Sequence, residues 1–340
     1  MSIRAKAWKK KTPPRRVLAI RLQAMGDTIG TLPYLQHLRK TLPPDTRLDF
    51  LTRKETDSIP RNIVLFDRIW SIGGGRSFKR QILSSALLMP ALLLQRYELV
   101  LDLQNNSLSR SIRRILLPHA WSEYDRFSPI SGAERYRLTI EAAGLGANAL
   151  DSGFQLRNPL AGIPLLAHQG WIPRQPLIVL NPAGAFETRH WPIANYAAFA
   201  ALWQKDFPEA RFLILGTPFI AEKARTLKTL LGEALIDLVG LTTTYQAFSI
   251  LQHAQFMLSE DSGLMHMAWL SGIPTLALFG STRSDWSRPL GDHTLLLDSS
   301  DLSCGGCMQS ACRFGDNHCL TRYTPQQVYN NAIGLIKKLN

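Results

Sequence analysis

Four short segments of the sequence combine small residues with carboxylate, hydroxyl, guanidinium or imidazole groups, which are groups that bind phosphates and move protons. The first is Met25-Gly26-Asp27-Thr28, where Gly26 permits a tight turn. Asp27 has two interpretations: it is a general base for a substrate hydroxyl, or it caps the helix that follows. Gly26 lacks the further glycines of a dinucleotide-binding fingerprint.

The second segment, residues 181–192, joins small residues to a hydroxyl and a guanidinium. Gly184 is expected to form a turn, and Thr188 and Arg189 follow it. Such a loop suits an anionic group, because arginine binds phosphate through two parallel hydrogen bonds. The alternative is that Trp191 and Pro192 form a packing turn and that Arg189 is exposed.

The third segment, residues 259–266, ends a predicted strand and begins a predicted helix. The free N–H groups and the positive dipole end of a helix start favour a phosphate. Asp261 could accept hydrogen bonds from sugar hydroxyls, and His266 lies one turn inside the helix. An N-capped helix with a core histidine is the alternative. The fourth segment ends another strand, where Ser281 and Thr282 could add phosphate contacts.

The four cysteines lie in one stretch with the spacing C-x2-C-x4-C-x6-C, at Cys304, Cys307, Cys312 and Cys319. The first pair has the spacing of a metal knuckle, in which two thiolates bind one ion, whereas the second pair does not. A structural metal and reduced thiols in a compact loop both remain open. Catalysis by these thiols is not expected, because no spaced His and Asn accompany them.

These segments follow predicted strands, which alternate with predicted helices along the chain. A strand at 17–20 precedes the Gly26 turn and a helix in which Pro33 fits only the first turn. In the rest of the first half, we expect strands at 47–52, 64–66 and 99–103, and helices at 79–95 and 109–117. In the second half, we expect strands at 177–181, 211–216, 236–239, 255–259 and 274–279, and helices at 195–206, 218–231, 244–254, 262–270 and 325–339.

This alternation predicts an α/β fold of βαβ units with parallel sheets. A proline-rich stretch interrupts the pattern, so we expect two Rossmann-like domains that face each other across a cleft. Ligands bind at the carboxyl ends of parallel strands, where all four segments lie. The expected parts are a basic tail at 1–16, an N-terminal domain at 17–160, a linker at 161–176, a C-terminal domain at 177–325 and a final helix at 326–340.

The net charge of +13 over 340 residues lies entirely in the first half of the chain. Residues 1–170 contain 26 Lys and Arg against 13 Asp and Glu, whereas residues 171–340 contain 13 of each kind. This asymmetry indicates an anionic partner, with a solvated basic face as the alternative. Nucleic-acid motifs, a long apolar run and a signal-like N-terminus are missing, so we expect a cytoplasmic protein that binds no nucleic acid.

Together these blocks resemble glycosyltransferase family 9, the ADP-heptose:lipopolysaccharide heptosyltransferases. The most specific block is Asp261-Ser262-Gly263-Leu264-Met265-His266, with Phe279-Gly280-Ser281-Thr282 downstream. The Gly26-Asp27 turn followed by Pro33, the segment from Gly184 to Pro192 and the cysteine loop match as well. The order and separation of the blocks agree over most of the chain.

The resemblance implies a GT-B fold, with the acceptor bound mainly by the N-terminal domain and the nucleotide sugar by the C-terminal one. It implies inversion at the anomeric carbon with Asp27 as general base, and ADP-heptose as donor without a required cofactor. Family members commonly carry lysine near Trp-Pro for the donor phosphates; Arg189 takes that position here, and His190 stands where arginine is frequent. The implied donor-binding residues are Thr188, Arg189, Asp261, Ser262, Gly263, His266, Ser281 and Thr282.

The implied acceptor is the inner core of lipopolysaccharide at the cytoplasmic face of the inner membrane, which carries carboxylates and phosphates. The basic first half would concentrate such an acceptor, and the tail at 1–16 and the helix at 79–96 are the candidates for peripheral membrane contact. The alternatives are a GT-B transferase with another nucleotide sugar or a protein acceptor, and a non-catalytic glycan-binding homologue.

Overall fold

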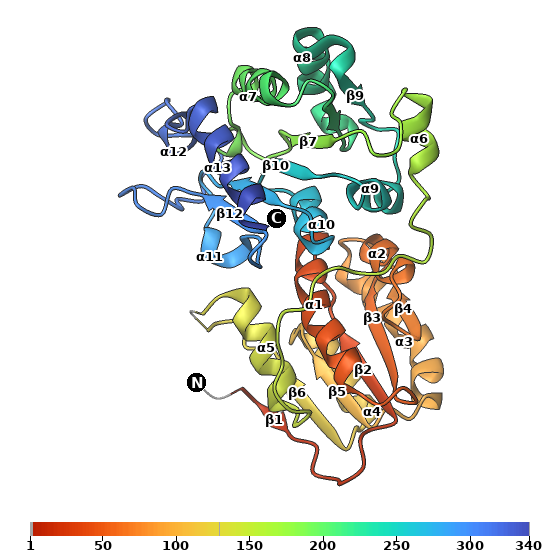
Figure 1. The fold of residues 1–340 in the computed structure, drawn as a ribbon. Coiled ribbons are helices and arrows are strands. Elements are labelled where there is room, and N and C mark those ends of the chain that lie inside the picture. Colours follow the sequence, from red (N-terminus) through yellow and green to blue (C-terminus); the bar gives the residue numbers. More distant parts are fainter. Residues whose placement is uncertain (1–2, 129, 340) are drawn as a thin grey trace. The chain divides into compact units, whose positions relative to one another are not determined.

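The computed structural model describes residues 3–128 and 130–339 and divides the chain into two compact units, Met1–Arg157 and Asn158–Asn340. Each unit contains a six-stranded sheet with helices around it (Figure 1). The stretch expected as a linker, 161–176, belongs to the second unit, where α6 (Ile163–His168) packs against α9 (Thr244–Leu251). None of the helices in the described part of the chain has the length and hydropathy needed to span a bilayer.

The sheet of the first unit consists of β1 (Ala5–Lys6), β2 (Arg16–Ile20), β3 (Arg47–Arg53), β4 (Arg68–Ile72), β5 (Leu99–Asp102) and β6 (Ala120–Glu123). Its order is β1-β6-β5-β2-β3-β4, and all pairs are parallel except the antiparallel pair of β1 with β6. The central strands β2 and β5 are almost entirely buried, as parallel strands with both faces covered should be. Part of the expected basic tail thus forms an edge strand.

Helices connect the parallel strands of this unit. α1 (Met25–Thr41) packs beside α5 (Gly132–Ala142), and α3 (Phe78–Leu94) packs beside α4 (Ser107–Leu116) (Figure 1). The short helix α2 (Ser58–Asn62) comes between β3 and β4 in the chain. The helices expected at 79–95 and 109–117 are confirmed to within two residues.

Three expectations for the first unit are wrong. Residues 64–66 lie outside any strand, with the Val64 N–H donating to the Gln155 carbonyl at 2.8 Å, and the strand is β4 instead. Gly26 lies inside the first turn of α1 rather than in a tight turn before the helix. Pro33 lies in the middle of α1, where its ring removes one helical hydrogen bond. The helix continues because its buried face packs against the unit.

The sheet of the second unit is entirely parallel, with the order β12-β11-β10-β7-β8-β9. Five of its strands are confirmed to within two residues of their expected ends, and β12 was not expected. The strands are β7 (Leu177–Asn181), β8 (Arg211–Ile214), β9 (Leu235–Asp237), β10 (Phe256–Glu260), β11 (Thr275–Leu278) and β12 (Thr294–Leu297).

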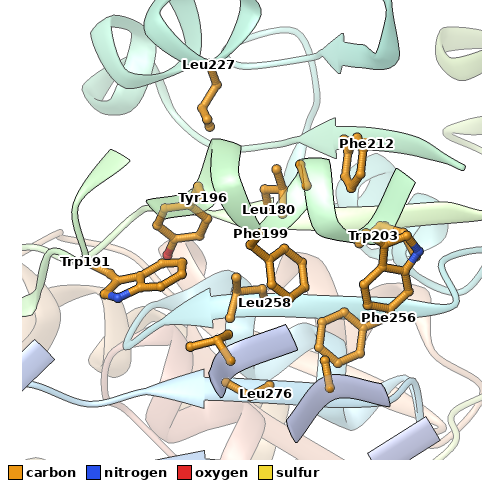
Figure 2. Packing of buried hydrophobic residues seen from close by; sticks show 14 of the residues in the cluster. Leu180, Trp191, Tyr196, Phe199, Trp203, Phe212, Leu227, Phe256, Leu258 and Leu276 are labelled. Carbon is orange, nitrogen blue, oxygen red and sulfur yellow. The ribbon is translucent and has the colours of Figure 1, made fainter. Parts of the chain in front are cut away.

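The core of the second unit is rich in aromatic side chains (Figure 2). Phe199 and Trp203 of α7 (Ile193–Asp206) stack on Phe256 of β10, with ring centroids 6.2 and 5.2 Å from it. The Tyr329 ring of α13 (Pro325–Leu339) lies 6.0 Å from the Trp203 ring, so the C-terminal helix belongs to this core. The remaining helices are α8 (Ala221–Leu231), α10 (Gly263–Leu270), α11 (Ser284–Ser287), α12 (His318–Thr321) and α13 (Pro325–Leu339).

In both sheets the first of the parallel strands lies near the middle, and later strands add on both sides of it. β2 lies between β3 and β5, and β7 lies between β8 and β10. The loops after these central strands therefore diverge at a topological switch point, where open α/β sheets bind ligands. Asp27 follows β2, residues 181–192 follow β7, and residues 259–266 span the end of β10.

Candidate active site

Asp27 lies in the first turn of α1, and 40% of its side chain is exposed. It does not cap the helix, because the N-cap position is Ala24 and no side chain caps this end. The Asp27 carboxylate instead accepts a hydrogen bond from Arg21, with 2.8 Å between Nη2 and Oδ1. Within the described residues, Oδ2 accepts no hydrogen bond, so one oxygen is held and the other is available.

Arg21 is a buried cation that holds the Asp27 carboxylate. Its side chain is 5% exposed, and its Nη1 donates to the Leu103 carbonyl at 2.5 Å. The guanidinium carbon lies 5.2 Å from the Tyr124 ring centroid and 5.1 Å from that of Tyr136. These contacts fix the guanidinium from several sides, because cations are attracted to aromatic ring faces. Sequence reasoning missed Arg21, although it directly follows a predicted strand.

The loop after β5 supports Arg21 and was also missed. The carboxylate of Asp102 accepts the Asn105 N–H at 2.7 Å, and the Gln104 side chain accepts the Leu22 N–H at 3.1 Å. Burial raises the pKa of Asp102. The loops after β2 and β5 are therefore tied together at the switch point of the first sheet, and Arg21 links Asp27 to them.

In the second unit, the carboxylate of Glu260 holds the segment that follows β7. It accepts the N–H of Gly184 at 2.8 Å and the N–H of Trp191 at 2.7 Å. A Cβ at Gly184 would lie 2.7 Å from the Arg189 carbonyl and 2.9 Å from Glu260, so only glycine fits this close approach. The Gly184 carbonyl lies 2.8 Å from Nε2 of His190. The expected turn at Gly184 is therefore a loop folded around one buried acid.

Glu260 is fully buried, and burial raises its pKa to about 7. Its nearest cation is Lys223, with 3.9 Å between Nζ and Oε2, and burial lowers the pKa of that ammonium. A carboxyl with a pKa near neutrality is costly to ionise in the interior, so the N–H donors of the loop must compensate its charge. Sequence reasoning missed this role of Glu260.

Arg189 and Asp261 meet in the structure, with 3.1 Å between Nη1 and Oδ2. Both side chains are largely buried, and the guanidinium lies 4.7 Å from the Phe186 ring centroid. The interpretation of Arg189 as a simply exposed residue is therefore wrong. Its Nε is buried and has no hydrogen-bond partner among the described residues, which leaves a donor for a ligand.

The first turn of α10 has its N–H groups at the end of β10. The Ser262 hydroxyl caps the helix by accepting the Met265 N–H at 3.3 Å, and it also accepts from Asn181 at 2.6 Å. Gly263 opens the helix, and a Cβ there would meet nothing within 4 Å. His266 is mostly buried, and its Nδ1 accepts the Trp269 indole N–H at 3.2 Å. The capping alternative is thus correct for Ser262, and it leaves the N–H groups of Gly263 and its neighbour for a ligand.

The hydroxyls of Thr188 and Ser281 lie 2.8 Å apart, which joins the loop after β7 to the loop after β11. Thr282 is buried, and its Oγ1 has no partner in the part of the chain that the structure describes. The eight expected donor-binding residues thus gather at the carboxyl ends of β7, β10 and β11, linked by the Arg189–Asp261 and Thr188–Ser281 contacts. The Arg189 Nε and the Thr282 hydroxyl have no hydrogen-bond partner in the described part of the chain. Both can donate to an anion, so this edge of the sheet suits one.

The cysteine loop closes one side of a cavity of about 680 Å³ that Thr188 and Ser281 also line. All four cysteines are free, and the Cys319 Sγ lies 4.0 Å from the Thr188 carbonyl. Burial, together with the other three thiols, raises the pKa of Cys319. Among the described residues, no group of three His, Cys, Asp or Glu side chains has a metal-binding arrangement. Metal analysis separates the two open alternatives. A structural metal predicts one bound ion per chain, and reduced thiols predict four titratable cysteines.

Comparison with known proteins gives relatives over most of the chain. The family model described as glycosyltransferase family 9 (heptosyltransferase) matches residues 87–318. Lipopolysaccharide heptosyltransferase 1 of Pseudomonas aeruginosa is 25% identical, over 92% of this chain and 96% of the relative. Lipooligosaccharide heptosyltransferase 2 of Campylobacter jejuni is 26% identical, over 51% of this chain and 54% of the relative.

Solved structures give the same fold. The glycosyl transferase family 9 protein from Veillonella parvula aligns with a TM-score of 0.81 and 18% identity, covering 95% of this chain and 97% of that one. The ADP-heptose lps heptosyltransferase II of Escherichia coli aligns with a TM-score of 0.73 and 17% identity, covering 95% of this chain and 99% of that one.

Two Rossmann-like units, each with polar loops at its switch point, define a protein of the GT-B class, as expected. The family match covers more than half of the chain. The chain therefore belongs to glycosyltransferase family 9 (heptosyltransferase) and is a glycosyltransferase.

Proposed function

We propose that this chain is an inverting heptosyltransferase that moves heptose from ADP-heptose to the inner core of a lipopolysaccharide-type acceptor. The observation that supports the mechanism most is Asp27, a half-exposed carboxylate held by one buried arginine at the switch point of the first sheet. The names of the relatives, lipopolysaccharide and lipooligosaccharide heptosyltransferases, support the sugar and the acceptor class. An Escherichia coli heptosyltransferase solved with ADP supports the nucleotide.

In the proposed reaction, the acceptor hydroxyl oxygen attacks the anomeric carbon of the heptose on the face opposite the diphosphate. The new C–O bond forms while the bond from that carbon to the diphosphate oxygen breaks, and ADP leaves with the electron pair. The hydroxyl proton passes to Oδ2 of Asp27, while Arg21 keeps Oδ1. A single displacement inverts the anomeric carbon, and general base catalysis of this kind contributes about 10²- to 10⁴-fold in rate.

The diphosphate gains negative charge as ADP leaves. The donor-binding residues at the ends of β7, β10 and β11, here called the donor cluster, compensate this charge. Arg189 offers its buried Nε, Thr282 its buried hydroxyl, and α10 the N–H groups at Gly263. Asp261 is proposed to accept a hydroxyl of the sugar with the oxygen that Arg189 does not hold. The donor-binding set is completed by Thr188, Ser262, His266 and Ser281. The reaction written in this way needs no metal ion.

The acceptor class fits the charge of the first half of the chain. Residues 1–170 carry twice as many Lys and Arg as Asp and Glu. Inner-core sugars carry carboxylates and phosphates, so long-range attraction would concentrate them at this unit. We propose that the chain works in the cytoplasm at the inner membrane, where such an acceptor is assembled.

Calorimetric titration with ADP, UDP and GDP tests the donor assignment. We expect ADP to bind at least tenfold more tightly than the other two nucleotides. Arg189→Gln should weaken ADP binding roughly tenfold to a hundredfold, because hydrogen bonds to charged groups are worth about 1.5–3 kcal/mol. Arg225→Gln, at an exposed arginine of α8, is the matched control and should leave binding unchanged. Tighter binding of UDP or GDP would indicate a transferase for another nucleotide sugar.

A further inference from the structure

The outer face of α3 is apolar and lies in solvent. Leu83, Leu87 and Leu94 are 62%, 77% and 77% exposed, and Pro90 between them is exposed as well. Their spacing of three or four residues places them on one side of the helix, and we call these four residues the α3 face. Exposed leucines scattered singly need no explanation, but a continuous apolar row marks an interaction site.

The opposite side of α3 already fulfils the packing role of the helix. Leu92 is buried in the core cluster of the first unit, and Leu88 and Met89 pack against that cluster. Ser85 on the same side is buried too. The helix is therefore seated correctly on its sheet, and the α3 face is a second apolar surface that the core does not need.

Positive charge surrounds the α3 face. Residues 68–97 contain five cations and no acid: Arg68, Arg76, Lys79, Arg80 and Arg96. The neighbouring helix α4 also lacks Asp and Glu, and Arg114 at its end is exposed beside Ile115 and Leu117, which are exposed as well. An apolar row flanked by cations without acids is the pattern of a helix that lies on an anionic membrane surface.

We propose that the α3 face docks the enzyme on an anionic lipid bilayer. The leucines enter the boundary between head groups and acyl chains, and Lys79, Arg80 and Arg96 meet lipid phosphates. This inference rests on the proposed function, because docking on a membrane brings the enzyme to an acceptor that is anchored in the same membrane. In this proposal the membrane contact depends on leucines that are buried in lipid. Composition alone predicts only a charge attraction.

Charge complementarity favours a bilayer over a second copy of this chain. In a two-fold symmetric pair of α3 helices, the cations at 76–80 of one copy would lie near Arg96 or the same cations of the other. No acid in residues 68–97 could pair with them. Such a dimer would bring like charges together, whereas phosphatidylglycerol supplies the missing negative charge.

Vesicle sedimentation tests the proposal. The full chain should bind vesicles of 30% phosphatidylglycerol in phosphatidylethanolamine at least tenfold more tightly than vesicles of phosphatidylcholine. The triple variant Leu83→Ser, Leu87→Ser, Leu94→Ser should lose at least tenfold in binding, and Leu87→Gln alone should lose about threefold, because these side chains are only partly transferred from water into the head-group boundary. Lys79→Glu with Arg80→Glu should also weaken binding.

The matched control is the triple variant Leu160→Ser, Leu230→Ser, Leu241→Ser, which removes three comparably exposed leucines of the second unit. It should bind vesicles like the wild-type chain. Unchanged binding by the α3 triple variant would overturn the proposal, as would a loss that follows only from changes to Lys9, Lys10 and Lys11 in the tail. A concentration-dependent dimer in sedimentation velocity that the α3 triple variant abolishes would assign the face to a second copy and overturn it too.

An activity measurement separates this inference from the proposed function. Heptose transfer to a deacylated, water-soluble acceptor should be the same for the wild-type chain and the α3 triple variant, while transfer to acceptor in vesicles should fall in the variant. Vesicle binding by a chain that transfers no heptose would leave the docking face standing and remove the proposed function. Transfer without vesicle binding would do the reverse.

Discussion

The charged groups of the site are held by partners that lie far away in the sequence. Arg21 donates to both Asp27 and the carbonyl of Leu103, 82 residues away. Glu260 binds the N–H of Gly184, 76 residues away. These contacts decide which oxygen, nitrogen or proton remains available to a substrate, so the chemistry is set by side chains whose own role is positioning.

The first prediction concerns Asp27. Asp27→Asn keeps an oxygen that accepts from Arg21 but removes the base, so we expect transfer to fall about 10³-fold. ADP should bind with unchanged affinity, because the variant alters the first unit alone. Asp45→Asn, at an exposed carboxylate of the same unit, is the control and should keep full activity. A transfer rate for Asp27→Asn within tenfold of wild type would contradict the assignment of the base.

The second prediction concerns Glu260 and pH. Its pKa is about 7 in the folded chain, above the value near 4.3 of an unfolded glutamate, so the folded state holds the proton more tightly. The stabilisation from this group is complete below about pH 4.3 and is lost as the pH rises through 7, by roughly 4 kcal/mol in all.

Urea unfolding of the wild-type chain and of Glu260→Gln between pH 5 and pH 8 measures this contribution. As the pH rises, the unfolding free energy of the wild-type chain should fall relative to that of Glu260→Gln. His190 is a second titrating group near this loop, and burial lowers its pKa, but it is present in both chains and cancels in the difference. A difference that stays constant with pH would exclude the elevated pKa of Glu260.

Residue types and spacing could predict Asp27, Arg189 and Asp261, because charged groups directly after strands face the ligand edge of a parallel sheet. They could not predict that Arg189 and Asp261 pair with each other, or that Glu260 folds the loop around Gly184. Those contacts depend on which strands become neighbours, and β7 and β10 are joined in space although two strands lie between them in the chain.

At the scale of elements, the site depends on how helices begin at strand ends. α10 starts at Gly263 directly after the Ser262 cap, and no side chain crowds the Gly263 Cα. A glycine in open space has no packing reason to lack a Cβ. Close approach of a diphosphate to the backbone gives the reason, because a Cβ would stand between the N–H groups and the phosphate oxygens.

The third prediction follows from this open position. Gly263→Ala should raise the stability of the chain by about 0.5 kcal/mol, because alanine is the better helix former, and it should weaken ADP binding at least tenfold. Gly334→Ala in α13 is the matched control, since a Cβ there also meets nothing within 4 Å. It should stabilise the chain without any effect on ADP. Unchanged ADP binding by Gly263→Ala would remove α10 from the donor site.

Most long elements could be predicted from the alternation of apolar strands and amphipathic helices, whereas four short strands, β1, β4, β6 and β12, could not. β6 has the sequence AWSE and β1 only two residues, so neither carries a recognisable pattern. α1 was expected to start late because proline disfavours a helix interior, yet Pro33 is tolerated there. Packing of the buried face outweighs the local cost of one missing hydrogen bond.

At the scale of the whole molecule, charge divides the chain in the same way as the fold. The basic first half coincides with the unit that contains Asp27 and the α3 face, and the neutral second half contains the donor cluster. Composition could predict this division, because it is a sum over many residues. Composition could not predict which basic helix carries an exposed apolar row, since that depends on which side of α3 the sheet covers.

Mass spectrometry of a heptose-deficient lipopolysaccharide core, incubated with the chain and ADP-heptose, tests the central claim most directly. The account predicts that the core gains the mass of one heptosyl group, that ADP is released in equal amount, and that the new linkage has the anomeric configuration opposite to that of the donor. Release of ADP with no heptosyl group on the core, or a linkage that retains the donor configuration, would contradict it.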